Sequence, residues 1–330
     1  MQYRKGSLVL GSFADIPIKV HWSFGLLLLF IIYYVLEHNL SAVEGLWFFS
    51  LVLLMFCFVI MHEYGHALTA RRYGVSTKDI IISPIGGVAR LSYIPKKALH
   101  ELYIAVAGPA VNLVLLILFG TVLLISGKPL LPTSEMIINP LTHWSDYIGV
   151  LLSINGALVV FNLIPAFPMD GGRILRALLT MGLKDHQQAT MIASYVGQGL
   201  AVLFVIGGAY FDHYMLMFIG IFVFLTAQAE RRFIARENKL NQLQVIDLLN
   251  SQDRDERTMT EDIAGLNLTS AETANTHDRY GYVSHNIPIN KLFELMNRQG
   301  WLSVIVRDEN KKEVGVVDRP LLLSYINKVS

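Results

Sequence analysis

The sequence predicts an α-helical polytopic membrane protein with about six transmembrane helices, a short membrane-associated β-hairpin and a small α/β cytosolic C-terminal domain. The first observation is composition: 53% of the 330 residues are hydrophobic and only 16% are charged, whereas soluble domains carry about 25% charged residues. The second is the distribution of charge, since residues 1–230 hold 25 charged side chains and residues 231–330 hold 28. We therefore expect a membrane core at 1–230 and a soluble domain at 231–330.

The expected spans are apolar segments close to the length of about 20 residues that a helix needs to cross the hydrocarbon core. They lie at about 20–36, 46–70, 102–126, 147–168, 189–210 and 214–229. The first and last are short, and the fifth is rich in glycine, so the ends of these three segments are the least defined.

Lysine and arginine residues predict the orientation of the spans. If the N-terminus is cytoplasmic, the inner segments hold sixteen of these residues and the outer segments hold only Lys128. Because cytoplasmic loops are enriched in Lys and Arg, both termini are expected in the cytoplasm, with the chain crossing a plasma or inner cell membrane and surrounded by its lipid. The formal net charge is only +1, which argues against a nucleic-acid partner.

Residues 78–91 predict a β-hairpin between the second and third spans. An Ile-rich run is followed by Pro84, Gly86 and Gly87 and then by a second short apolar run, a pattern typical of two strands around a turn. Open sheet edges are not tolerated in lipid. The hairpin must therefore lie against protein or a water-filled cavity.

His62, Glu63 and His66 form an HExxH pattern toward the cytosolic end of the second span. On a helix, His62 and His66 lie on one side, as two ligands of one metal must. Imidazole suits zinc, and Glu63 can act as the general base that activates zinc-bound water. The alternative is a polar helix end that is stabilised by interfacial water.

A third ligand is expected downstream, because a catalytic zinc site uses three protein ligands and leaves one position open. In residues 162–173, Pro165 and Pro168 break the helix before Asp170. A carboxylate in a broken helix at membrane depth needs a partner, and a metal is a good one. Residue spacing alone leaves open a simple turn in which Asp170 caps the following helix.

Together these motifs resemble the site-2 proteases, which are intramembrane zinc metalloproteases. The resemblance covers about residues 15–230 and is carried by residues 62–75 (HEYGHALTARRYGV), 107–113 (AGPAVNL) and 162–173 (NLIPAFPMDGGR), together with Gly86 and Gly87. It implies zinc-dependent cleavage of transmembrane segments of membrane proteins, as in regulated intramembrane proteolysis.

The resemblance also implies a role for each matching residue. His62, His66 and Asp170 would bind one zinc ion per chain, and Glu63 would be the catalytic acid and base. Asn112 and Asn162 would position the substrate or the oxyanion. Gly86 and Gly87 would belong to a hairpin that dips toward the active site.

The C-terminal hundred residues predict a small α/β domain in the order strand, helix, strand, strand, helix, preceded by a flexible insertion at 251–279. This order, with Gly315–Leu322, resembles one CBS module. Asp318 and Leu321 replace the hydroxyl and acidic residues that bind nucleotide in that family, which argues against nucleotide binding. Since such modules pair, we expect a homodimer through this domain; the alternative is a degenerate domain that only recruits partners or restrains substrate entry.

Two rival functions remain open at this point. A catalytically silent membrane scaffold or chaperone could keep the same fold, although the intact HExxH motif and Asp170 speak against it. A metal transporter could hold zinc at the membrane midplane, but transporters usually carry paired half-repeats with broken helices, and the sequence shows no such repeat.

Overall fold

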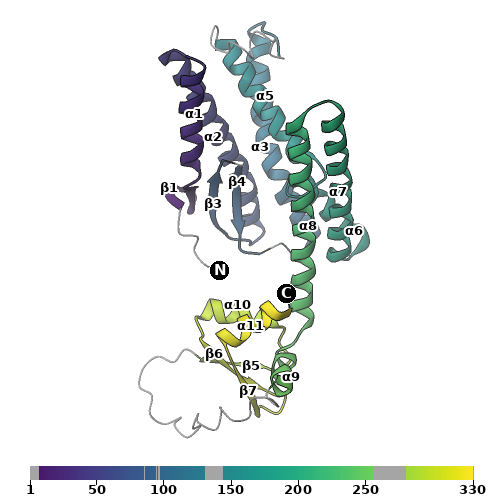
Figure 1. The fold of residues 1–330 in the computed structure, drawn as a ribbon. Helices are drawn as coiled ribbons and strands as arrows, with labels where there is room; N and C mark the ends of the chain where they lie inside the picture. The colour runs from purple at the N-terminus through teal and green to yellow at the C-terminus, as the bar shows by residue number, and fades with distance from the viewer. Residues whose placement is uncertain are drawn as a thin grey trace. The chain divides into compact units, whose positions relative to one another are not determined.

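The computed structural model describes residues 7–84, 86–93, 95, 97–130, 144–255 and 280–329. The chain divides into two compact units, Met1–Glu230 and Arg231–Ser330, named here the membrane unit and the C-terminal unit (Figure 1). Most of the expected insertion, residues 256–279, lies outside the described residues.

In the described residues, five helices are long and apolar enough to cross a membrane. They are α2 (Ala42–Arg72), α3 (Ala98–Ile125), α5 (Trp144–Leu163), α7 (His186–Tyr210) and α8 (Tyr214–Gln242). Five of the six expected segments overlap these helices, and the remaining one, at about 20–36, overlaps a shorter apolar helix. The first helix, α1 (Phe24–Glu37), has 14 residues and is about 21 Å long, because the expected first segment begins inside a β-strand.

α1 and α2 nevertheless form a helical hairpin (Figure 1). The side chain of Arg71, at the end of α2, donates to the carbonyl of Ala14, and Tyr64 Oη donates to the carbonyl of Ile16 over 3.1 Å. The segment before α1 and the end of α2 therefore lie on the same side of the membrane unit.

A four-stranded sheet lies at this end of the helical hairpin. Its order is β1 (Ser7–Phe13), β2 (Ile16–His21), β3 (Thr77–Ser83) and β4 (Gly86–Leu91), with β2 and β3 parallel. The expected hairpin is confirmed as β3 and β4, whereas β1 and β2 were not predicted. Ile80 and Ile82 of β3 are buried in a cluster with residues of α2, which fixes the sheet against that helix.

One buried carboxylate joins three strands of this sheet. Asp79 of β3 accepts hydrogen bonds from Arg90 of β4 and, over 2.7 Å, from Lys19 of β2. The Arg90 hydrogen bond, with a further contribution from Lys19, lowers the pKa of Asp79 despite the opposing effect of burial. Asp79 is therefore charged in the folded protein at neutral pH.

Helix α6 (Asp170–Leu183) follows the break after α5, and a buried ion cluster connects it to its neighbours. Arg176 of α6 donates to Glu101 of α3 over 2.8 Å and to Glu230 of α8 over 2.6 Å. His186, the first residue of α7, lies 3.5 Å from the other oxygen of Glu101. Three helices thus meet at Arg176, and α7 joins the same cluster through Glu101.

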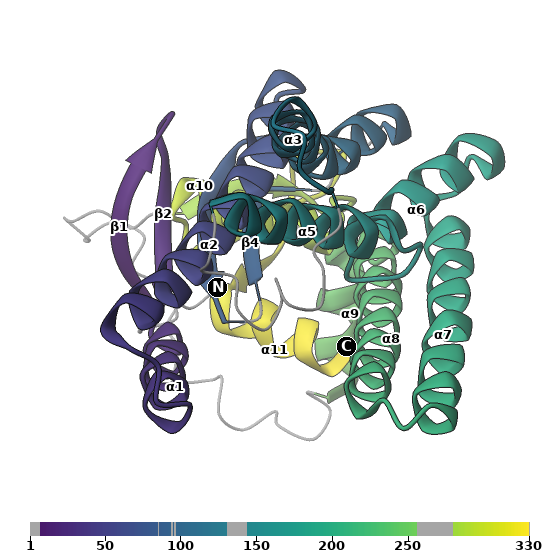
Figure 2. The same ribbon diagram turned by 90° about the horizontal axis from the view of Figure 1, so that it is seen from above.

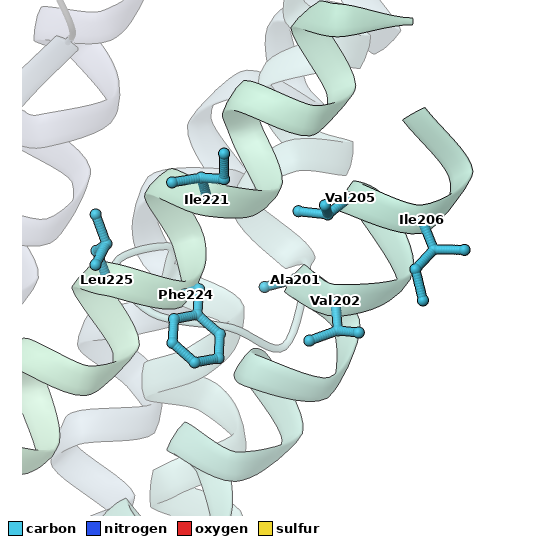
Figure 3. Close-up of a pocket in the computed structure, with 7 residues that line it drawn as sticks. All are labelled: Ala201, Val202, Val205, Ile206, Ile221, Phe224 and Leu225. Atoms are coloured by element: carbon cyan, nitrogen blue, oxygen red, sulfur yellow. The ribbon is translucent and has the colours of Figure 1, made fainter. Parts of the chain in front are cut away.

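Helices α7 and α8 lie side by side (Figures 1 and 2). They approach closely at Gly220, where an added Cβ would lie 2.7 Å from the carbonyl oxygen of Ala201. Figure 3 shows a pocket between them whose lining is wholly apolar: Ala201, Val202, Val205, Ile206, Ile221, Phe224 and Leu225. Such a surface suits lipid contact.

The C-terminal unit is an α/β structure. Its elements after α8 are α9 (Val245–Asp255), β5 (Tyr280–Ser284), α10 (Ile289–Gln299), β6 (Ser303–Arg307), β7 (Glu313–Asp318) and α11 (Arg319–Val329). The order strand, helix, strand, strand, helix is confirmed. β5 is parallel to β6, and β6 is antiparallel to β7. One apolar cluster, which includes Leu248, Leu292 and Val304, forms the core.

Candidate metal centre

His62, His66 and Asp170 converge inside the membrane unit. Asp170 Oδ2 lies 3.0 Å from the Nε2 atom of each histidine, and the two Nε2 atoms are 3.1 Å apart. All three residues are buried, with exposed fractions of 4–6%. Three ligand atoms therefore face one point, as a single metal ion requires.

The local folding of two segments produces this convergence. His62 and His66 lie one turn apart on α2, and Asp170 is the first residue of α6. The backbone before α6 folds back tightly, because a Cβ on Gly171 would lie 2.2 Å from the carbonyl oxygen of Ile164, and one on Gly172 would lie 2.7 Å from Ala166. The two glycines thus allow Asp170 to reach the histidines of α2.

The three residues fit a zinc ion. In a tetrahedral site with bonds of about 2.0 Å, ligand atoms lie about 3.3 Å apart, so the observed separations need to widen by only a few tenths of an ångström. His66 Nδ1–H donates to the carbonyl of Ile104 over 2.6 Å, and His62 Nδ1–H donates to Asn112 Oδ1 over the same distance. Both Nε2 atoms are therefore left as lone-pair donors, which is the usual arrangement of metal-binding histidines.

Glu63 lies beside this cluster and contacts the β-sheet. Its carboxylate accepts a hydrogen bond of 2.7 Å from the backbone N–H of Ala89 in β4. Gly87 of β4 packs against the same side chain, because an added Cβ there would lie 2.8 Å from Glu63 Cγ. The glycine of the hairpin thus lets β4 approach the HExxH helix closely.

Comparisons with known proteins agree with this site. The sequence profile of peptidase family M50 matches residues 49–141 and 133–204, which include His62, Glu63, His66 and Asp170. A zinc metalloprotease of Methanocaldococcus jannaschii is 35% identical over 253 residues, which are 74% of this chain and 66% of that protein. The solved structure of a site-2 protease from the same organism matches 68% of this chain and 95% of that chain at 35% identity, with a TM-score of 0.47.

The chain belongs to peptidase family M50, the site-2 protease family of zinc metalloproteases. Relatives from Synechocystis and Mycobacterium tuberculosis are 32% and 28% identical, over 53% and 64% of their own lengths. The chain thus spans between about half and two thirds of the length of these three relatives.

In this M50 chain, Asn112 lies next to a metal ligand. Besides accepting from His62, it donates from Nδ2 to Asn155 Oδ1 over 3.0 Å, and both asparagines are fully buried. Asn162, at the end of α5, donates to the carbonyl of Leu158 over 2.9 Å; in the part of the chain that the structure describes, no hydrogen bond joins it to the three ligands. Gly86 is the first residue of β4, directly after the turn, with φ of +141°.

Two residues near the metal centre were missed by the sequence analysis. Gly108 of α3 faces the ligands so closely that an added Cβ would lie 2.2 Å from His66 Nε2 and 2.7 Å from His62 Nε2. Asn155 of α5 lies behind Asn112. Gly108 stands within the AGPAVNL motif, which could have signalled it, but no local pattern connects Asn155 to His62, because 93 residues separate them in the sequence.

Proposed function

We propose that the protein is a zinc-dependent intramembrane endopeptidase that cleaves transmembrane segments of membrane proteins, as in regulated intramembrane proteolysis. The observation that carries the proposal is the buried triad of His62, His66 and Asp170 within a set of membrane-length helices. Buried histidine and carboxylate groups are costly in a membrane and mark functional sites. Protein substrates that enter the bilayer are the class such a site can reach.

Glu63 is proposed as the general acid and base. Zinc, when bound, supplies a Lewis acid for a peptide carbonyl and lowers the pKa of a water molecule. Glu63 follows the ligand His62 directly and can accept the proton of the attacking water. It then donates this proton to the leaving amine. The N–H of Ala89 orients the carboxylate.

Strand β4 is proposed as the place where an unwound substrate segment binds. A helical substrate must be opened locally, since its carbonyls are occupied by i→i−4 hydrogen bonds. β4 is the last strand of its sheet and contacts Glu63, so a segment that adds to its edge would lie near the metal centre. Gly86 and Gly87 begin this strand. Proline substitutions along β4 that left cleavage unchanged would contradict this step.

Asn112 and Asn162, which lie in the motifs shared with the site-2 proteases, are proposed to have different roles. Both ends of the Asn112 amide are occupied, by His62 and Asn155, so Asn112 is suited to orienting a ligand. Asn162 has one amide hydrogen beyond its bond to Leu158 and is half-buried. We assign it the role of positioning the substrate or the oxyanion.

The orientation with both termini in the cytoplasm remains our proposal. Several contacts gather the basic ends of helices on one side of the membrane unit. Tyr73 after α2 stacks on His100 of α3 with ring centroids 4.3 Å apart, and Arg176 binds Glu230. With the positive-inside rule, these contacts favour that side as cytoplasmic. Accessibility of Arg173→Cys and Lys128→Cys to a membrane-impermeant thiol reagent in a Cys57→Ser background tests it.

The C-terminal unit is proposed as a CBS-like module that pairs with a second copy of this chain. Tyr282, Ile305 and Val316 face one another across β5, β6 and β7, and Tyr282 and Val316 are at least half exposed. This apolar row suits an isologous contact. Nucleotide binding is not part of the proposal, because Asp318 adds a carboxylate where phosphate would lie. A Val316→Glu variant that leaves the oligomeric mass unchanged from a dimer would contradict the pairing.

Cleavage of single-span model substrates by the detergent-purified protein tests the main proposal. We expect cutting within the span, located by mass spectrometry, that a zinc chelator stops and Glu63→Gln abolishes while zinc content stays unchanged. No cutting by a zinc-loaded protein, with residues 231–330 present or deleted, would favour the scaffold function. Zinc uptake into vesicles by the Glu63→Gln variant would favour the transporter.

A further inference from the structure

We infer that Asn155 is a positioning residue for the metal centre, which fixes the tautomer and ring orientation of His62 through Asn112. The inference rests on the zinc site described above and goes beyond it, because Asn155 contacts neither the metal-binding atoms nor the proposed substrate path. It is carried by a chain of three hydrogen bonds between buried groups, from His62 on α2 through α3 to the backbone of α5.

The direction of each hydrogen bond in this series follows from its last acceptor, the backbone carbonyl of Leu151. The carbonyl oxygen of Leu151 can only accept, so the Asn155 group 2.9 Å away must be the Nδ2 donor. This leaves Asn155 Oδ1 facing Asn112, which must donate from its own Nδ2 over 3.0 Å. Asn112 Oδ1 is then turned toward His62 Nδ1, 2.6 Å away.

An acceptor at His62 Nδ1 holds the hydrogen on that nitrogen and leaves Nε2 with its lone pair, the form that binds zinc. A single hydrogen bond holds His66 in the same tautomer, since its Nδ1–H donates directly to the carbonyl of Ile104. Each ligand histidine is thus anchored on a backbone carbonyl, His66 directly and His62 through two amides. A backbone carbonyl in a helix can only accept, whereas a side-chain amide can rotate by 180° and exchange its accepting oxygen for its donating nitrogen.

Among the described residues, the Asn112 side chain is hydrogen-bonded to His62 and Asn155 alone, so the loss of Asn155 would leave the orientation of its amide unfixed. Asn112, Asn155 and the ligand His62 are buried at 0%, 0% and 5% exposure, so water does not compete strongly for these groups. A rotated Asn112 would present its N–H₂ to His62 Nδ1 and favour the tautomer with hydrogen on Nε2. That tautomer cannot bind the metal through Nε2.

Zinc affinity, measured by competition with a chromophoric chelator on the full-length protein in detergent, tests the inference. Outer partners of metal ligands typically contribute 10- to 100-fold in affinity, so we expect Asn155→Leu to weaken zinc binding about 10-fold or more. Asn155→Asp should stay near wild type, because burial favours its protonated form, whose O–H donates to Leu151 and whose C=O accepts from Asn112. Ser153→Ala is the matched control, since Ser153 also bonds a carbonyl one turn back on α5.

A second variant shows whether Asn155→Leu weakens zinc binding through the orientation of the Asn112 amide or through altered packing. In the Asn155→Leu background, Asn112→Asp places a carboxyl group against His62 Nδ1–H. Unlike the group at position 155, it lies next to a zinc-bound imidazole, which favours its charged form, and both oxygens of that form accept. We expect it to restore zinc affinity, and the visible spectrum of the cobalt-substituted protein should return to the tetrahedral form. Equal zinc affinity of Asn155→Leu and wild type would overturn the inference, as would equal weakening by Leu and Asp at position 155. If the wild-type protein bound no zinc, the metal centre itself would be wrong, and the inference with it.

Discussion

In the described residues, the buried polar and charged side chains all lie in the membrane unit, between His62 and Ser194, whereas the C-terminal unit buries a cluster of Val, Leu, Ile and Met around Leu292. The exposed surface of the membrane helices is rich in large apolar side chains instead, among them Leu203 of α7. In lipid, apolar burial gives helices no driving force for association, while in water it dominates folding. The interior of the membrane unit therefore combines apolar clusters with buried polar contacts and close backbone approach, and it holds the metal centre.

The largest expected effect comes from adding a side-chain atom where α3 approaches the metal centre. Gly108→Ala places a Cβ at 2.2–2.7 Å from both Nε2 atoms, which is shorter than any non-bonded contact. We expect near-complete loss of bound zinc, measured by metal analysis of the purified protein. Gly199→Ala in α7 is the control, because no atom lies within 4 Å of its added Cβ. Full zinc content in Gly108→Ala would show that α3 does not pack on the ligands.

The ion cluster gives the next largest effect. Arg176→Met leaves the fully buried Glu101 without its arginine, and breaking a buried ion pair costs about 3–5 kcal/mol. Thermal unfolding in detergent should show a large loss of stability. The double variant Arg176→Met/Glu101→Leu should recover most of it, since apolar residues can replace a buried pair. A double variant as unstable as Arg176→Met would mean that the charge left on Glu101 is not the cause.

Apolar truncation should distinguish the two units. Leu292→Ala in the C-terminal core should cost about 2–5 kcal/mol, measured as faster hydrogen exchange of β6 in the full-length protein. Leu203→Ala, at 63% exposure on α7, should change stability by less than about 0.5 kcal/mol. Similar losses at both positions would indicate that Leu203 packs against protein and not lipid.

The smallest effect is a pH dependence in the β-sheet. The folded state lowers the pKa of Asp79, chiefly through Arg90, so its contribution to stability is complete above the unfolded pKa and is lost as the pH falls through the folded pKa. Hydrogen bonds to a charged group contribute about 1.5 kcal/mol or more. Acidification from pH 7 to below 4 should therefore lower the melting temperature less in Asp79→Asn than in wild type. If the melting temperatures of both proteins depended on pH in the same way, charged Asp79 would not stabilise the β-sheet.

Local patterns in the sequence were sufficient for part of the metal centre. His62 and His66 are four residues apart, and helical geometry alone brings them to one side. Asp170 is more than one hundred residues away. Its spacing did not decide whether it is a metal ligand or a helix cap, and the family motif around it favoured the ligand. The broken helix before Asp170 was predicted from Pro165 and Pro168.

Contacts between helices could not be predicted from the sequence. Asn155 and Arg176 look like ordinary residues of an apolar and an amphipathic helix, and their roles depend on which helices are neighbours. The strands at Ser7–Phe13 and Ile16–His21 pair locally across Ala14 and Asp15, and they were missed because this turn lacks the Asn-Gly or Asp-Gly pair that is typical of hairpins. β2 pairs with β3, about sixty residues later, and no turn signal connects them.

The central claim is that His62, His66 and Asp170 of the membrane unit form one zinc site, and zinc content per chain tests it most directly. It should be measured by metal analysis on wild type, Glu63→Gln, Asp170→Ala and Asn162→Ala, all purified without added chelator. We predict one zinc in wild type, Glu63→Gln and Asn162→Ala, and almost none in Asp170→Ala. Unchanged zinc in Asp170→Ala, or a wild-type protein that binds none when zinc is supplied, would contradict the account.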